Sequence, residues 1–333
     1  MIQGILSTIG HTPLVRLDKI LKDVSFQLFA KLEACNPGGS IKDRPAINII
    51  KHGIRTGLIT PETTIIESSS GNMGIGLAQV CAYLGLRLIC VVDVKTTRRN
   101  LRLLETYGAE IDIIRTPDLG NGEFLRARIE RVRELHARIK DSFCPNQYAN
   151  QANSSSHHQT MHEIATSLEG RVDYLFCATS TCGTLRGCVE YIRAEKLPTT
   201  VCAVDALGSV IFGSGKRKRL IPGHGAALKP ALFQDDLADK VIHVSDLDCI
   251  IGCRRLMKTE AVLAGGSSGA VVMAVEQIRD EISDGANCVM ILADRGERYL
   301  DTIYSDAWVR ENFGDLAHRW ESIDEAYAEL AVA

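Results

Sequence analysis

Lys42 is the residue of this chain best placed for covalent chemistry. It lies in residues 36–45, Asn-Pro-Gly-Gly-Ser-Ile-Lys-Asp-Arg-Pro, where proline and two glycines predict a turn. A helical pattern over 44–50 follows, so the amine is expected at the start of a helix. Burial and the positive end of a helix both disfavour an ammonium ion, which would make this amine a nucleophile. Such an amine can form a Schiff base with an aldehyde cofactor.

Three turns rich in glycine and serine lie further along the chain, and each opens a helical pattern. Residues 67–74 are Glu-Ser-Ser-Ser-Gly-Asn-Met-Gly, residues 180–184 are Ser-Thr-Cys-Gly-Thr, and residues 265–269 are Gly-Gly-Ser-Ser-Gly. Hydroxyl groups and the N–H groups at a helix start bind carboxylates and phosphates. Each turn alone could be an ordinary helix cap, but three that face one cleft predict a site for anions.

A dinucleotide site is a second interpretation of the first turn. The glycines at 71, 74 and 76 are spaced GxxGxG, however, whereas that site has GxGxxG. The acidic residue that should follow would have to be Asp93. The spacing therefore does not favour a dinucleotide.

Short apolar runs alternate with helical patterns, which predicts an α/β fold with a largely parallel sheet. The expected strands are 63–67, 86–92, 109–115, 174–178, 200–205, 240–244 and 288–293. The expected helices are 75–84, 96–107, 122–139, one starting at Thr184, 246–263 and 268–282. Because the pattern begins again after about residue 145, we expect two α/β halves with a cleft between them.

The composition argues against several classes of protein. A net charge of −3 gives no sign of nucleic-acid or membrane binding, and no apolar run approaches the roughly 18 residues that span a bilayer. The eleven cysteines are scattered and form no CxxC pair, as in a reduced protein. Cys249 and Cys253 have helical spacing but no further ligands for a metal. With no signal-peptide pattern at the start, we expect a cytoplasmic protein.

Three histidines and one basic run are expected to have structural or surface roles. His157, His158 and His162 lack the acid of an HExxH site, so we expect surface or packing roles and no metal. Residues 216–219, Lys-Arg-Lys-Arg, are expected in an exposed loop. This run could attract anions to the rim of the cleft, or serve as a nuclear-localisation signal.

The ordered motifs resemble the fold-type II enzymes of the cysteine synthase and cystathionine β-synthase family, which use pyridoxal 5′-phosphate (PLP). The resemblance runs from residues 8–17, Thr-Ile-Gly-His-Thr-Pro-Leu-Val-Arg-Leu, to residues 296–300, Gly-Glu-Arg-Tyr-Leu. It implies a homodimer with a tryptophan synthase β-like fold of two α/β domains around PLP. The implied parts are a smaller domain at 35–145 with a mobile subdomain at about 86–135, a larger domain at 1–34 plus 146–315 that carries the phosphate loop, and a tail at 316–333.

The resemblance also implies roles for single residues. Lys42 would hold PLP as a Schiff base and, once released, act as general base on the substrate. Asn72 would meet the ring hydroxyl and Ser267 the pyridine nitrogen. The residues implied around the cofactor phosphate are Ser180, Thr181, Cys182, Gly183 and Thr184. Those implied around the substrate carboxylate are Ser69, Ser70, Gly71 and Met73, with Gln147 beside them.

Departures from the usual motifs concern the choice of substrate. Cysteine synthases typically have Pro-Thr-Ser-Gly-Asn-Thr-Gly, Gly-Thr-Gly-Gly-Thr and Pro-Ser-Ser-Gly-Glu-Arg-Tyr where this chain has 68–74, 180–184 and 293–299. The changes resemble a narrower branch, the N-(2-amino-2-carboxyethyl)-L-glutamate synthases of siderophore (2,3-diaminopropionate) biosynthesis. That resemblance implies a transferase that replaces the phosphate of O-phospho-L-serine with the amine of L-glutamate.

Such substrates carry several carboxylates and a phosphate, so the cleft should hold additional cations and hydroxyls. The candidates are Arg126, Arg128, Tyr148 and Ser180. The main alternative is a cysteine synthase that uses sulfide with O-acetylserine or O-phosphoserine. Threonine synthase, a serine/threonine dehydratase, a catalytically silent PLP-binding paralogue and a nucleotide-dependent dehydrogenase are further alternatives.

Overall fold

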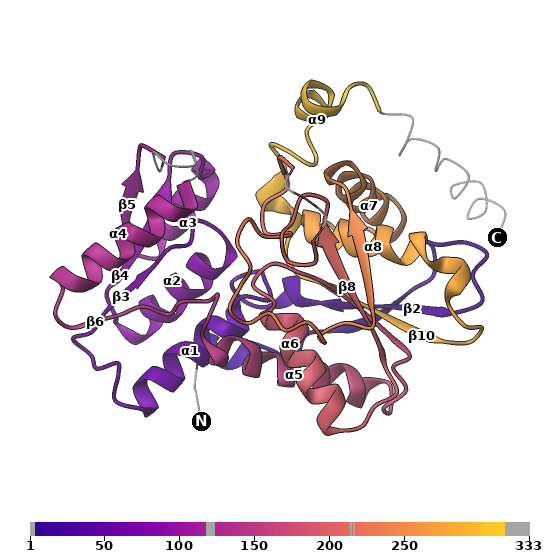
Figure 1. The fold of residues 1–333 in the computed structure, drawn as a ribbon, viewed down its shortest axis with the longest axis horizontal. Coiled ribbons are helices and arrows are strands. Elements are labelled where there is room, and N and C mark those ends of the chain that lie inside the picture. Colours follow the sequence, from indigo (N-terminus) through magenta and orange to yellow (C-terminus); the bar gives the residue numbers. More distant parts are fainter. Residues whose placement is uncertain (1–3, 118–123, 214, 216, 317–333) are drawn as a thin grey trace.

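The computed structural model describes residues 4–117, 124–213, 215 and 217–316. These residues form two α/β domains side by side, a smaller one from the N-terminal half and a larger one that contains most of the rest (Figure 1). The α/β fold expected from the sequence is therefore confirmed. None of the helices within these ranges is both long and apolar enough to cross a membrane.

The larger domain is built on a six-stranded sheet. Its strand order is β1 (Leu14–Leu17), β2 (Gln27–Leu32), β10 (Asn287–Leu292), β7 (Tyr174–Ala178), β8 (Thr200–Ala206) and β9 (Lys240–Val244). Only the pairing of β1 with β2 is antiparallel; the other four are parallel. The N-terminal strands thus join the sheet of the C-terminal half.

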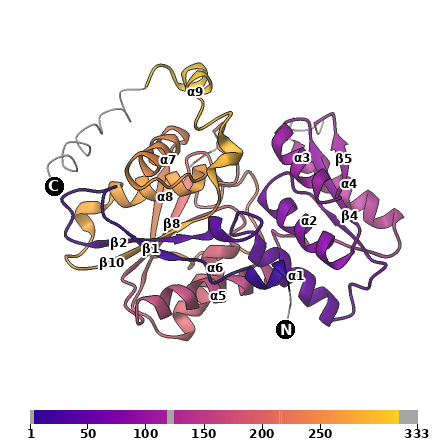
Figure 2. The same cartoon turned by 180° about the vertical axis from the view of Figure 1, so that it is seen from behind.

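Helices cover both faces of this sheet (Figures 1 and 2). On one face α5 (Gln151–Ser167) packs against α6 (Gly183–Ala194), and on the other α7 (Asp246–Glu260) packs against α8 (Gly266–Gln277). Strand β10 serves both layers, because Cys288 and Met290 lie in one core while Val289 and Ile291 lie in the other. Both faces of the strand are therefore apolar, as expected for a parallel sheet covered on both sides.

The smaller domain has a four-stranded sheet in which every pairing is parallel. Its strand order is β5 (Glu110–Ile114), β4 (Leu88–Asp93), β3 (Thr64–Glu67) and β6 (Ser142–Phe143). Its helices are α1 (Asp43–Arg55), α2 (Asn72–Leu84), α3 (Arg98–Thr106) and α4 (Phe124–Arg138). Short 3-10 helices η1 (Ile5–Thr8), η2 (Glu33–Cys35), η3 (Arg279–Glu281) and η4 (Gly296–Tyr299) and the last helix, α9 (Asp306–Phe313), complete the described chain.

Each expected strand is present, with its ends within two residues of the expected ones. Strands β1, β2 and β6 and helices α5 and α9 were not anticipated. The expected helix 268–282 is wrong at its end, because α8 stops at Gln277 and η3 follows. The domain limits and the mobility of 86–135 stay predictions, and most of the 316–333 tail lies outside the described residues.

A buried ion network fixes the start of α1 against the larger domain. Arg44 forms two hydrogen bonds of 2.7 Å with the Glu33 carboxylate, and its Nη1 donates to Glu163 Oε1 at 2.9 Å. Lys31 Nζ donates to Glu163 Oε2 at 2.6 Å. The side chains are at most 7% exposed. Because Arg44 is two residues beyond Lys42, the network also fixes the backbone of that lysine.

Candidate active site

Lys42 is the N-cap of α1 and lies between the two domains. Ile41 donates its N–H to the Ala293 carbonyl at 2.8 Å, which ties the lysine turn to the end of β10. On the other side Gly76 of α2 packs closely, since a Cβ there would lie 3.2 Å from the Lys42 carbonyl oxygen. Burial lowers the pKa of Lys42, as expected from the sequence.

The first turn precedes α2, whose N-cap is Gly71. Ser69 is buried and its hydroxyl accepts the Gly74 N–H at 3.0 Å, so its side chain caps the helix. Ser70 accepts a hydrogen bond from Asn100 at its carbonyl oxygen. A Cβ at Gly71 would meet no atom within 4 Å, so this end of the helix is open to a ligand. Met73, implied to offer its N–H, has a buried side chain.

The second turn follows β7 and opens α6, with Cys182 as N-cap in the left-handed region (φ 63°). Thr181 Oγ1 accepts from Asn153 Nδ2 at 3.2 Å. Gly183 allows Asn153 to pack underneath, since a Cβ there would lie 2.2 Å from Asn153 Oδ1. The first N–H groups of a helix have no partner within it, so this loop has donors for a phosphate. Ser180, the first residue of the turn, is partly exposed.

His157 supports the same loop from α5. Its Nε2 lies 3.2 Å from Thr184 Oγ1 and its Nδ1 lies 3.2 Å from Thr160 Oγ1. Burial, together with the positive charges of Lys42 and Arg44, holds the pKa of His157 well below its usual value. The ring is therefore neutral and can accept from one hydroxyl and donate to the other.

The other two histidines lie on the exposed side of α5. His158 pairs with Glu190 at 2.8 Å, and His162 contacts the Tyr191 hydroxyl at 3.0 Å. Cys249 and Cys253 lie in the core of the larger domain. Within the described part of the chain, no cluster of three or more His, Cys, Asp or Glu side chains could hold a metal ion.

The third turn opens α8 and adjoins the end of β10. Ser267 stands in the first turn of this helix and is 9% exposed. Ser268 Oγ accepts the Ala293 N–H at 3.0 Å. Next to it, Asp294 Oδ2 accepts from Asn72 Nδ2 of the smaller domain at 2.7 Å. The structure therefore brings Lys42, Asn72 and the third turn together at Asp294, a residue noted in the sequence only as a departure from a motif.

Some of the residues expected to bind substrate lie beside the first turn, and others do not. Arg128 Nη1 lies 3.4 Å from Ser70 Oγ, and its Nε lies 3.4 Å from Asp93 Oδ2. Burial raises the pKa of the Tyr148 phenol, and the positive charge of Arg128 is close enough to lower it in part. Arg126, in contrast, is exposed and makes no hydrogen bond or ion pair with a described residue. The geometry favours Arg128 over Arg126.

Glu67 is the last residue of β3 and the first residue of the first turn, and no role of its own was predicted for it from the sequence. It is buried, and burial raises its pKa to about 7 against the hydrogen bonds from the N–H groups of Gln147 and Ser68. Gln147 is itself buried, and its carbonyl accepts from Asn153 at 2.7 Å. Glu67 and Asn153 thus connect Gln147 to the first and second turns.

The donor set fits PLP. Lys42 offers an amine, Asn72 an amide and Ser267 a hydroxyl, and the start of α6 offers N–H groups for the phosphate. Asn153 Oδ1 and Asp294 Oδ1 are buried polar atoms without a hydrogen bond to any described residue. Both oxygens can therefore accept a hydrogen bond from a ligand in the cleft. PLP supplies an aldehyde for the amine and a ring that accepts electrons.

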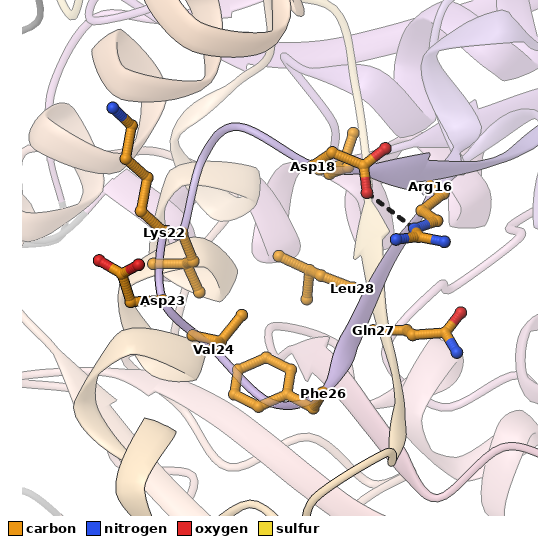
Figure 3. Close-up of a pocket in the computed structure, with 10 residues that line it drawn as sticks. Arg16, Asp18, Lys22, Asp23, Val24, Phe26, Gln27 and Leu28 are labelled. Carbon is orange, nitrogen blue, oxygen red and sulfur yellow. Dashed lines mark ion pairs between the residues drawn. The ribbon is translucent and has the colours of Figure 1, made fainter.

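A separate hollow of about 390 Å³ lies inside the β1–β2 hairpin (Figure 3). Among its lining residues are Arg16, Asp18, Lys22 and Phe26, and Arg16 pairs with Asp18 at 2.7 Å. None of the residues expected to bind cofactor or substrate lines it. It is therefore not part of the candidate site.

Comparison with known proteins agrees with this geometry. Residues 5–294 match the family described as pyridoxal-phosphate dependent enzyme, so the chain belongs to that family. It is a fold-type II PLP enzyme of the cysteine synthase and cystathionine β-synthase kind.

Three solved structures illustrate the likeness, each with a TM-score of 0.84. An O-ureido-L-serine synthase is 29% identical, with 99% of each chain covered. An O-acetylserine dependent cystathionine β-synthase from Helicobacter pylori is 30% identical over 92% of this chain and 99% of that one. O-acetylserine sulfhydrylase isoform 3 from Entamoeba histolytica is 31% identical over 91% and 92%.

Proposed function

We propose that this enzyme replaces the phosphate of O-phospho-L-serine with the amine of L-glutamate. The products are inorganic phosphate and N-(2-amino-2-carboxyethyl)-L-glutamate, a precursor of 2,3-diaminopropionate for siderophores. The Cβ–O bond of O-phosphoserine breaks, and a Cβ–N bond to glutamate forms. The similar structures are named for different products and donors, so the family alone does not decide this choice.

The position of Arg128 supports the proposal. Its guanidinium stands beside Ser70, in the turn proposed for the substrate carboxylate, and its Nε has a 3.4 Å ion pair with Asp93 but no hydrogen bond with a described residue. Glutamate brings two carboxylates that a guanidinium can bind in a bidentate manner. Sulfide brings no such group. Tyr148 and Ser180, both partly exposed, are proposed to line the same region.

Each residue has a defined task in the proposed reaction. Lys42, once released from the cofactor, removes the Cα proton of O-phosphoserine, which its lowered pKa favours. The N–H groups at Ser70 and Met73, beside the start of α2, orient the carboxylate. Closure of the proposed mobile subdomain would exclude water from the reacting carbon.

The direct test is to supply O-phosphoserine or O-acetylserine together with glutamate, sulfide or another amine, one at a time, and to identify products by mass spectrometry. We expect N-(2-amino-2-carboxyethyl)-L-glutamate from O-phosphoserine and glutamate, with release of an equal amount of phosphate. Lys42→Ala protein serves as the blank. Cysteine as the dominant product would contradict the proposal and support the cysteine synthase alternative.

Arg128→Met is expected to raise KM for glutamate about 10- to 100-fold, because a charged hydrogen bond is worth roughly 1.5–3 kcal/mol. The matched control is Arg133→Met on the same helix, whose side chain is 72% exposed and pairs with Glu130. Initial rates against glutamate concentration measure both variants. Equal KM values for the two variants would remove Arg128 from the substrate site.

We also infer a homodimer, supported by large apolar side chains left exposed at the ends of α1 and α2. They are Ile54 (47%), Leu58 (58%), Tyr83 (45%) and Leu84 (41%). A second copy covering them would remove this apolar surface from water. Light scattering of the purified protein measures the mass directly, and a monomer would exclude the inference.

A further inference from the structure

Asp294 lies in the candidate cofactor cleft, yet none of the steps above uses it. Its backbone forms an antiparallel bridge with Ser40, two residues before Lys42. Gly265, at the start of α8, donates its N–H to the Asp294 carbonyl at 3.2 Å. The side chain therefore stands where the lysine turn, the third turn and the end of β10 meet.

The two oxygens of this carboxyl group have different surroundings. Oδ2 accepts from Asn72 Nδ2 at 2.7 Å and from the Tyr299 hydroxyl at 2.5 Å. Oδ1 is buried and receives no hydrogen bond from any described residue. Gly265 makes room for it, since a Cβ there would lie 2.1 Å from Oδ1. A buried acceptor without a partner is destabilising and rare in folded proteins, so the arrangement calls for an explanation beyond packing.

The contact with Asp294 determines which end of the Asn72 amide faces it. An ionised carboxylate only accepts hydrogen bonds, so Nδ2 must turn towards it and Oδ1 must turn away. The second hydrogen on Nδ2 remains free for another acceptor. Without the carboxylate, the amide could rotate and present its oxygen instead of its N–H.

We propose that Asp294 is a positioning residue: it keeps an N–H of Asn72 directed at the hydroxyl oxygen of the PLP ring, and its negative charge holds a proton on the nitrogen of Lys42. The first part prevents the amide oxygen from meeting an ionised ring oxygen, which would be repulsive. Both parts concern the cofactor alone, so they apply whichever nucleophile the enzyme uses.

Charged and polar groups from several elements face Asp294. Burial raises its pKa, whereas hydrogen bonds from Tyr299 and Asn72 and the positive charges of Arg298 and Lys42 lower it. Burial outweighs them, so the pKa of Asp294 stays above its usual value, and the support for an accepting carboxyl group is geometric: Asn72 Nδ2 and the Tyr299 hydroxyl both donate to Oδ2. The other titratable groups that face it are Cys253 and Tyr304.

Asp294 is the carboxylic acid that raises the pKa of Lys42 against the effect of burial. Burial lowers the pKa of Lys42, while Cys177, Asp294 and Cys182 act in the opposite direction. Burial raises the pKa of both thiols to about 12, so near neutral pH they carry no charge. His157 faces the amine from α5 and is also neutral. When ionised, Asp294 therefore supplies a negative charge near this nitrogen.

The test compares Asp294→Asn with the native enzyme, both loaded with PLP. We expect the dissociation constant for PLP to rise about tenfold, and the pH midpoint of the visible absorbance change of bound PLP to fall by about one unit, as for loss of a nearby opposite charge. Asp301→Asn is the control, since that side chain is 85% exposed. Unchanged affinity and an unchanged midpoint, with only a lower unfolding temperature, would reduce Asp294 to a structural role.

A double-mutant cycle with Asn72→Ala separates the two parts. If Asp294 acts on affinity through Asn72, Asp294→Asn will weaken PLP binding no further in the Asn72→Ala background, but the pH midpoint will still fall. Additive losses of affinity would contradict the positioning role. If Asp294→Asn protein does not fold, Asp294→Ser removes the same charge with a smaller side chain and must reproduce both changes. Tyr299→Phe removes one hydrogen bond to Asp294 but keeps the carboxyl group, so its midpoint must fall less than that of Asp294→Asn.

Discussion

Replacing Lys42 with alanine is expected to abolish the visible absorbance of lysine-bound PLP and to lower turnover by about 10³-fold or more. The reason is that the proposed reaction gives one amine two tasks: to hold the cofactor covalently and afterwards to move the Cα proton. Burial lowers the pKa of Lys42, which favours the uncharged amine that can act as a base. Absorbance spectra and initial rates measure the two effects.

Lys51→Ala is the matched control, because Lys51 lies on the same helix but is exposed. We expect its absorbance and rate to remain native. A Lys42→Ala protein that kept either the absorbance or the turnover would overturn the assignment of the cofactor lysine. Loss of both in the Lys51 variant would indicate that damage to α1, and not loss of the amine, explains the result.

Arg44→Met is expected to lower the free energy of unfolding by about 3–5 kcal/mol, because two buried carboxylates lose the cation that they share. Glu33 and Glu163 both bind this guanidinium at 2.7 Å. Burial alone would raise the pKa of Glu163, but Arg44 and Lys31 outweigh it and hold the pKa well below its usual value. Chemical denaturation measures the loss.

The control for this variant is Arg87→Met, which breaks an exposed pair with Glu110 and is expected to cost about 0–1 kcal/mol. The pH dependence gives a second readout. A carboxyl group with a lowered pKa in the folded state stabilises the protein above its unfolded-state pKa, and this stability is lost as the pH falls. We expect that acid dependence to shrink in Arg44→Met. Equal losses in both variants would show that the buried network has no special effect.

The elements that local pattern determines were predictable from the sequence. Strands such as β7 and β9 are short apolar runs between turn-forming residues, and the periodicity gives their ends closely. The lysine turn was also predictable, because proline and glycine specify it locally and Lys42 does precede a helix. Glycine and serine likewise indicated the helix starts at Gly183 and Gly266.

Other helices and strands could not be predicted from the sequence, because their buried faces are polar. The buried side of α5 contains Asn153, Ser156, His157 and Thr160, so the apolar stripe that marks a surface helix is missing. Strand β2 contains Lys31, which is buried only because Glu163 lies against it, 132 residues further along the chain. Such residues look like surface residues until their partners are known.

The sequence by itself determined the turns, most of the strands and the position of the lysine proposed to hold PLP, since these depend on neighbours within a few residues. Only the tertiary structure decided what surrounds that amine. The contact between Asn72 and Asp294 joins residues 222 positions apart, and the one between His157 and Thr184 joins two helices. Hydrogen bonds of this kind form when separate elements pack together, so spacing along the chain carries no signal of them.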